Sequence, residues 1–178
     1  RNLMSALVVA THVWPKGAET PSPCDVLELD FGGAIGDRHY GLTMKSDARQ
    51  KDVFPRGTEI RNHRQVSIVD LAELAVIAQS MGIAEIAPGL IADNICTEGI
   101  EHLTQLPHMT RLIFEGGAVL MLGGENFPCT IAGAMVGAVH GTSKSKFPKA
   151  AMGLRGVTGW VEHPGLVRPG TAIEVRTP

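Results

Sequence analysis

The sequence predicts a mainly β protein, either a strand-rich barrel or a sandwich, with only a few short helices. Glycine (21 residues) and proline (11 residues) are frequent in the 178-residue chain, which favours many short elements joined by turns. Several short apolar segments lie between these turn signals, and one segment has a strong helical pattern. The length suits a single domain over residues 1–178.

The first two strands are expected at residues 3–14 and 24–31. In the second segment Leu27 and Leu29 alternate with acidic residues, the period of a strand with one buried face. Residues 42–63 are then polar and charged, which predicts a long excursion from the fold. This excursion is either a lid or binding loop or a merely mobile surface loop.

A strand at 64–69 leads into the best predicted helix, which runs from Asp70 to Gly82. Asp70 is a capping residue, Glu73 stands three residues later as in a capping box, and Gly82 is a C-terminal stop. Apolar residues recur at helical spacing along one face, which predicts a packing helix. These residues are Leu71, Leu74, Ala75 and Ala78.

The rest of the chain contains short strand candidates separated by glycines and prolines. They are predicted at 92–97, 111–115, 117–122, 128–136, 155–162 and 171–176. The Gly-x-x-x-Gly spacing at 133–137 lies in an apolar stretch too short to indicate a membrane dimer.

The net charge, the apolar runs and the cysteine content argue against several classes of protein function. A net charge of −2 gives no reason to expect nucleic acid or an acidic membrane as a partner. No apolar run approaches the roughly 18 residues that span a bilayer, and residues 3–10 lack the basic leader of a signal peptide. The three cysteines have no paired spacing, so we expect free thiols and a cytoplasmic location.

Cys129 is the leading candidate for a catalytic or metal-binding residue. Pro128 stiffens the backbone that enters it. A thiol acts as nucleophile or metal ligand only as thiolate, which requires positive charge, a helix N-terminus or a metal nearby. Candidate cations are Arg38, His39, Lys149 and Arg155. The alternative is a buried cysteine that serves as a small apolar side chain.

Two polar segments are candidate ligand sites. Residues 36–41 (Gly-Asp-Arg-His-Tyr-Gly) suit a tight turn in which Arg38 clamps an anion and His39 carries a proton, or else a structural pair between Asp37 and Arg38. Asn94 either hydrogen-bonds a ligand or completes a strand end. The other histidines show no metal-ligand spacing.

Taken in order, these segments resemble the MOSC domain family, named for the C-terminal domain of molybdenum cofactor sulfurases. The resemblance runs from about Leu3 to about Val175. It rests on motifs at residues 36–41, 64–68, 88–95, 127–129 and 154–156, with Gly165 and Gly170. It implies a strand-rich barrel like the β-barrel domain of pyruvate kinase, with Cys129 as the single functional cysteine.

The resemblance implies two roles for Cys129. In the first, its sulfur ligates the molybdenum of a pterin cofactor (molybdopterin) in an enzyme that reduces N-hydroxylated substrates. Residues Arg38, His39, Asn94, Lys149 and Arg155 would then hold the phosphate or pterin. In the second, Cys129 is a sulfur carrier that passes a persulfide to a metal–sulfur centre.

The implied partners are a small-molecule substrate and either an electron-transfer reductase or a pyridoxal-phosphate-dependent cysteine desulfurase. A third reading is a non-catalytic module that binds a phosphate-bearing ligand, with Cys129 incidental. The family pattern often reads Gly-Glu-Asn where this chain has Ala92, Asp93 and Asn94, and an acid often follows the last glycine where this chain has Thr171.

Overall fold

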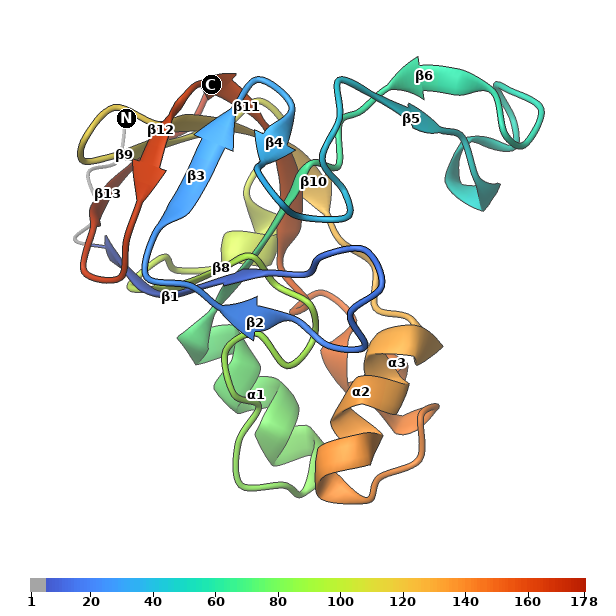
Figure 1. The fold of residues 1–178 in the computed structure, drawn as a ribbon. Coiled ribbons are helices and arrows are strands. Elements are labelled where there is room, and N and C mark those ends of the chain that lie inside the picture. The colour runs from blue at the N-terminus through green and yellow to red at the C-terminus, as the bar shows by residue number, and fades with distance from the viewer. Residues whose placement is uncertain (1–5) are drawn as a thin grey trace.

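A closed β-barrel forms the body of the protein. The computed structural model describes residues 6–178, in which seven strands pair around the barrel (Figure 1). In order around it they are β1 (Ala6–Val13), β8 (Ile95–Glu98), β7 (Val66–Asp70), β11 (Val157–His163), β10 (Val119–Glu125), β9 (Arg111–Phe114) and β13 (Ala172–Arg176). Pairing of β1 with β13, Ala6 opposite Ile173, closes the barrel. The predicted mainly β barrel is thus confirmed.

Shorter strands extend this barrel. A three-stranded sheet joins β12 (Gly165–Val167), β3 (Leu27–Asp30) and β4 (Gly33–Ala34), and β2 (Ser22–Pro23) pairs with β1. In β3 the leucines are buried and Glu28 is exposed, as the alternation predicts. The leucines join the barrel core, and burying such a side chain contributes about 1.5–3 kcal/mol.

The polar segment 42–63 contains a hairpin of β5 (Thr43–Lys45) and β6 (Glu59–Arg61), with the 3-10 turn η1 (Ala48–Gln50) between them. The hairpin projects from the barrel at the upper right of Figure 1. The predicted excursion is therefore ordered by strand pairing. A second 3-10 turn, η2 (Leu103–Gln105), precedes β9.

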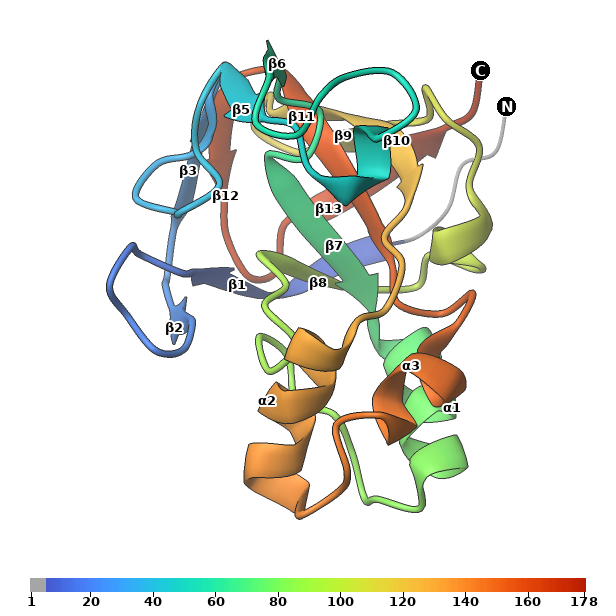
Figure 2. The same cartoon turned by 90° about the vertical axis from the view of Figure 1, so that its right-hand side faces the viewer.

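Three helices form a layer below the barrel, with an apolar core of their own (Figures 1 and 2). They are α1 (Leu71–Met81), α2 (Thr130–His140) and α3 (Lys146–Ala151). Helix α1 is the predicted helix, since Asp70 caps it and Gly82 ends it in the left-handed region. Within the described residues, no helix combines the length and the apolar character needed to cross a membrane.

Two details of the α1 prediction are wrong. Glu73 forms no capping box, because its Oε1 instead accepts hydrogen bonds from the backbone N–H and hydroxyl of Thr104, at 3.1 and 2.7 Å. Ala75 faces solvent, and Ile77 completes the buried face beside Leu74. The buried face of α1 therefore differs from the predicted one, and it consists of Glu73, Leu74, Ile77, Ala78 and Met81.

The strand prediction for 128–136 is wrong, because most of that segment is α2. Its buried residues Ala132 and Val136 have helical spacing, which an apolar run rich in alanine and glycine conceals. A Cβ on Gly133 would lie 2.0 Å from the carbonyl oxygen of Lys144, and one on Gly137 would lie 2.4 Å from that of Thr142. The Gly-x-x-x-Gly spacing thus lets the following loop approach the helix.

The other predicted strands correspond to β8, β9, β10, β11 and β13 with small shifts of their ends. Strand β8 begins only at Ile95, because residues 89–94 form turns in which Ala92 has a φ of 67°. The predicted strand at 3–14 is β1 from Ala6 onward, and residues 3–5 lie outside the described part.

Candidate functional site

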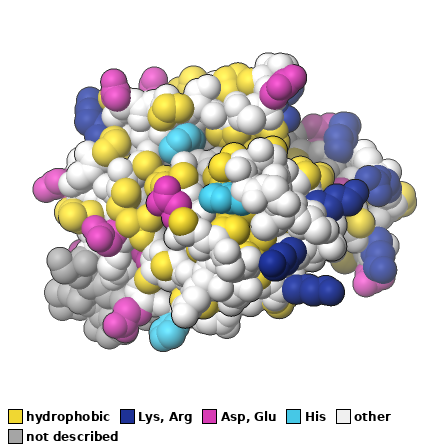
Figure 3. Space-filling model, turned by 90° about the horizontal axis from the view of Figure 1, so that it is seen from below, with side chains coloured by type: hydrophobic (Ala, Val, Ile, Leu, Met, Phe, Trp, Pro, Cys, Tyr) yellow, Lys and Arg dark blue, Asp and Glu magenta, His cyan; other side chains and the backbone are white. Residues whose placement is uncertain are grey.

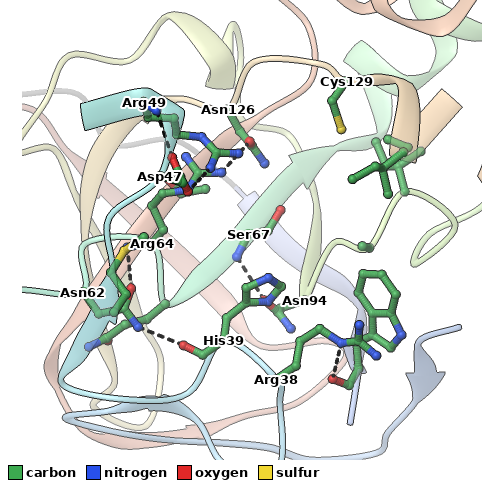
Figure 4. A pocket seen from close by; sticks show the side chains of 18 of the residues that line it. Arg38, His39, Asp47, Arg49, Asn62, Arg64, Ser67, Asn94, Asn126 and Cys129 are labelled. Atoms are coloured by element: carbon green, nitrogen blue, oxygen red, sulfur yellow. Dashed lines mark hydrogen bonds and ion pairs between the residues drawn. The ribbon is translucent and has the colours of Figure 1, made fainter. Parts of the chain in front are cut away.

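A pocket of about 650 Å³ lies beside the barrel, where the hairpin, α2 and the 14–16 segment meet. Its walls come from six parts of the chain: 14–16, 38–49, 62–67, 91–94, 126–135 and 155–158. In Figure 4, Cys129 and Asn126 lie on one side of the pocket and His39 and Arg38 on the opposite side, with Ser67 and Asn94 between them. The fold therefore brings distant polar segments together.

Cys129 lies exposed at the start of α2. Its backbone is extended (φ −133°, ψ 169°), it is the N-cap residue, and no side chain caps the helix there. The positive end of the 11-residue helix favours negative charge at this position. Cys96 is buried and Cys24 is half-buried, and burial raises the pKa of both thiols. Cys129 is thus the exposed thiol of the described chain.

The pocket walls are strongly basic. Among the described residues that line them, six cationic side chains stand against the single carboxylate of Asp47. The six are Lys16, Arg38, Lys45, Arg49, Arg64 and Arg155. Seen from below, Lys and Arg side chains gather on the right-hand side of the molecule, the side of the hairpin, α2 and α3 (Figure 3). The pocket therefore favours an anionic ligand although the net charge of the chain is −2.

Two arginines lie in electrostatic range of Cys129. The Nη2 of Arg64 donates to Oδ1 of Asn126 at 3.0 Å, and burial together with Arg49 lowers the pKa of Arg64 to about 10. Arg155 is buried, and its Nη2 donates to the carbonyl oxygen of Ile91 at 2.8 Å. Burial lowers the pKa of Arg155, and the carboxyl of Asp93 opposes this more than Cys129 does. Asp47 and, more weakly, Cys129 oppose the lowering of the pKa of Arg64. Both arginines line the pocket together with Cys129.

A buried carboxylate organises the opposite wall. Asp37 accepts hydrogen bonds from the backbone N–H groups of Trp14 (2.8 Å) and His39 (3.0 Å) and from Nδ2 of Asn94 (3.0 Å). It also lies 3.1 Å from Nδ1 of His39, so the pairing of Asp37 with Arg38 considered from the sequence is not formed. Burial raises the pKa of Asp37, but the hydrogen bonds from His39 and Trp14 outweigh it, and the net pKa is lowered.

Arg38 and Asn94 line the pocket while holding its walls together. Arg38 lies over the Trp14 ring at 3.6 Å, and its Nη2 donates to the carbonyl oxygens of Pro15 and Ala18 at 3.0 and 2.8 Å. Asn94 also donates to the His12 carbonyl and accepts from the backbone N–H of Ser67. Both side chains therefore fix the positions of neighbouring segments, whatever ligand they touch.

Some donors in the pocket wall have no partner in the described chain. The Ser67 hydroxyl and the Nε and Nη1 of Arg155 are buried without a hydrogen-bond partner. Leaving a buried donor unsatisfied costs about 1–3 kcal/mol, more for a charged group. These atoms therefore point to a ligand or ordered water that accepts hydrogen bonds.

The structure brings together five of the six predicted site residues: Arg38, His39, Asn94, Cys129 and Arg155. The sixth, Lys149, lies exposed on α3 and does not line the pocket, so the structure does not place it with the others. Their roles toward a ligand stay predictions. No cluster of three or more His, Cys, Asp or Glu side chains suited to a metal ion occurs among residues 6–178.

Sequence reasoning missed Arg64, Ser67 and Asn126 as pocket residues. Arg64 and Ser67 stand where the polar excursion returns to the strand at 66–70, which is a signal for a site at a strand end. Asn126 follows the last residue of β10 in the same way.

Comparison with known proteins agrees with this fold. The family model of the MOSC domain matches residues 37–174. The Bacillus subtilis (strain 168) protein YuaD, whose name proposes a role in metal-sulfur cluster biosynthesis, is 42% identical over 156 residues, which cover 86% of this chain and 81% of YuaD.

Solved structures show the same architecture. The crystal structure of YuaD from Bacillus subtilis matches with a TM-score of 0.94 and 38% identity, over 99% of this chain and 98% of that one. YiiM from Geobacillus stearothermophilus matches with a TM-score of 0.66 and 14% identity, over 96% of this chain and 74% of that one, and shows the fold alone. The protein therefore belongs to the MOSC domain family.

Proposed function

We propose that the protein is a sulfur carrier that holds sulfane sulfur as a persulfide on Cys129. The single observation that carries the proposal is an exposed thiol at the start of α2, at the edge of a pocket with six cations and one carboxylate. A thiolate attacks sulfur donors, and a persulfide is again an anion, so the same cations stabilise both forms. The name of YuaD, which refers to metal-sulfur cluster biosynthesis, is compatible with this role.

The test is transfer from a pyridoxal-phosphate-dependent cysteine desulfurase, the proposed protein partner. The reduced protein is incubated with a desulfurase and cysteine and then digested for mass spectrometry. We expect the Cys129 peptide to gain the mass of one sulfur atom and the Cys129→Ser variant to gain none. Cys24→Ser is the matched control and should load like the wild type. Sulfur found on Cys24 or Cys96 alone would contradict the proposal.

A second candidate is binding of a molybdenum–pterin cofactor, and the size of the pocket favours it. A volume of about 650 Å³ has room for a ligand of cofactor size, and the unpartnered donors of Ser67 and Arg155 fit an acceptor-rich, phosphate-bearing group. Cys129 would ligate the metal, while Arg38, His39, Asn94 and Arg155 would contact the organic part. The bound cofactor would supply the two-electron chemistry needed to reduce an N-hydroxylated substrate, with electrons from a reductase.

Elemental analysis tests this second candidate. The wild type and Cys129→Ser are purified from a host that makes the cofactor, and molybdenum is measured per chain. The candidate requires metal in the wild type that is lost or strongly reduced in the variant. Equal, negligible molybdenum in both would remove it and leave the carrier role unaffected.

A further inference from the structure

The strongest unexplained feature of the pocket is its set of unused hydrogen-bond donors. The Ser67 hydroxyl and two nitrogens of the buried Arg155 have no partner among residues 6–178. The buried Asp93 interacts electrostatically with Arg155, but its Oδ1 is also without a hydrogen-bond partner, so the two side chains form no direct hydrogen bond through that atom. The ligand that completes this wall must therefore bring several hydrogen-bond acceptors.

The start of α2 adds further donors and positive charge. Cys129, Ile131 and Ala132 line the pocket, and the helix has no side-chain cap at its first turn. The backbone N–H groups of a first helical turn and the helix dipole bind anions. Arg64, Cys129 and Arg155 line the same pocket, so an anion held by the two arginines shares that pocket with the thiol.

We propose that this pocket binds a small sulfur oxyanion of the thiosulfate class, and that Cys129 takes the sulfane sulfur from it. The inference rests on the proposed carrier function and names its sulfur source. The three oxygens of the sulfonate end match the donors of Arg155, Ser67 and the α2 terminus. Phosphate or sulfate would fit the same donors but has no sulfur atom to transfer.

The transfer step balances without an added oxidant or reductant. The Cys129 thiolate attacks the sulfane sulfur of thiosulfate, a new S–S bond forms, and the original S–S bond breaks. Sulfite leaves with the electron pair of the broken bond, and the persulfide on Cys129 keeps the negative charge. Thiolate and thiosulfate together carry three negative charges, which the arginines of the pocket offset.

The experiment incubates the reduced protein with thiosulfate and measures sulfite release and the mass of the Cys129 peptide. We expect sulfite and persulfide in equal amounts from the wild type and neither from Cys129→Ser. Loss of a hydrogen bond to a charged group should slow transfer roughly tenfold to a hundredfold in Ser67→Ala and in Arg155→Lys. The matched control is Lys149→Gln, because this lysine is an exposed cation of α3 that does not line the pocket.

Binding is measured separately from transfer. Sulfate should inhibit the reaction competitively in the wild type, and the inhibition should weaken in Ser67→Ala. Far-UV circular dichroism shows whether each variant is folded. If Arg155→Lys does not fold, Ser67→Ala still tests the proposal, because the Ser67 hydroxyl has no hydrogen-bond partner that the substitution would remove.

The outcomes separate this inference from the function on which it rests. If polysulfide or a desulfurase loads Cys129 but thiosulfate does not, the thiosulfate proposal is wrong and the carrier role stands. If no donor loads Cys129, both are wrong. Equal transfer rates in the wild type, Ser67→Ala and Arg155→Lys would also overturn the proposed anion site.

Discussion

Replacing Asp37 with alanine should destabilise the protein strongly, because one buried carboxylate joins three parts of the pocket wall. The change leaves the backbone N–H groups of Trp14 and His39 without their acceptor and removes one of two acceptors of Asn94 Nδ2. A hydrogen bond to a charged group contributes about 1.5–3 kcal/mol. The energy of the contact between Asp37 and the His39 ring is left out of the expected loss, because the His39 side chain is half exposed. The expected loss is about 3–5 kcal/mol of unfolding free energy.

Urea denaturation of the wild type and Asp37→Ala measures this loss, with Asp52→Ala as the control. Asp52 lies exposed on the projecting hairpin segment, so its substitution should change the free energy of unfolding by less than about 0.5 kcal/mol. A loss below about 1 kcal/mol for Asp37→Ala, with an unchanged m-value, would refute the reasoning that this carboxylate holds the wall together.

The pH dependence gives an independent check on Asp37. Its folded pKa is lowered below the ordinary 3.8, so the unfolded chain binds the proton more readily. The stabilising contribution is therefore complete above the ordinary pKa and is lost as the pH falls through the lowered one. The difference between the wild type and Asp37→Ala should be constant near neutrality and shrink below about pH 4. A stability difference that grows on acidification would contradict the conclusion that folding lowers the pKa of Asp37.

Two other substitutions test packing and buried charge. Gly156→Ala places a Cβ 2.0 Å from the Ile68 carbonyl oxygen at a φ of 96°, whereas Gly17→Ala meets nothing within 4 Å at a φ of 84°. Thermal denaturation should therefore show Gly156→Ala about 1–3 kcal/mol less stable than Gly17→Ala, and equal losses would exclude a close-contact effect. Burial raises the pKa of Glu73 above its ordinary 4.5, although Thr104 opposes this. The wild type should therefore lose stability relative to Glu73→Gln as the pH rises above 4.5, and parallel pH profiles would contradict this.

Local patterns in the sequence predict much of the barrel and the α1 helix. The alternation of Leu27 and Leu29 and the capping signals at Asp70 and Gly82 act within a few residues, so they can be recognised without knowledge of the tertiary contacts. The sequence pattern predicts a strand where α2 forms, because the glycines of this helix obscure the helical pattern. Close contacts with a later loop require these glycines. Such contacts leave no signal in the local pattern.

In the candidate site, too, the sequence motifs predict some of the residues, whereas others depend on contacts between distant parts of the chain. The order of motifs predicts that Cys129 and Arg38 share a pocket, and both line it. It does not predict that Lys149 lies outside the pocket on α3, because that depends on how the helices pack. Nor does it predict that Arg64 reaches Asn126, since this contact joins residues 62 positions apart in the chain.

The scattered origin of the pocket walls has a consequence for biosynthesis. The walls come from segments between Trp14 and Thr158, and Arg155 stands two residues before the first residue of β11. While a nascent chain is still on the ribosome and β11 is not yet made, the pocket that holds Cys129 and Arg155 cannot be complete, because β11 is needed to close the barrel. On the proposed carrier function, sulfur loading that depends on this pocket would therefore begin only in chains whose barrel has closed.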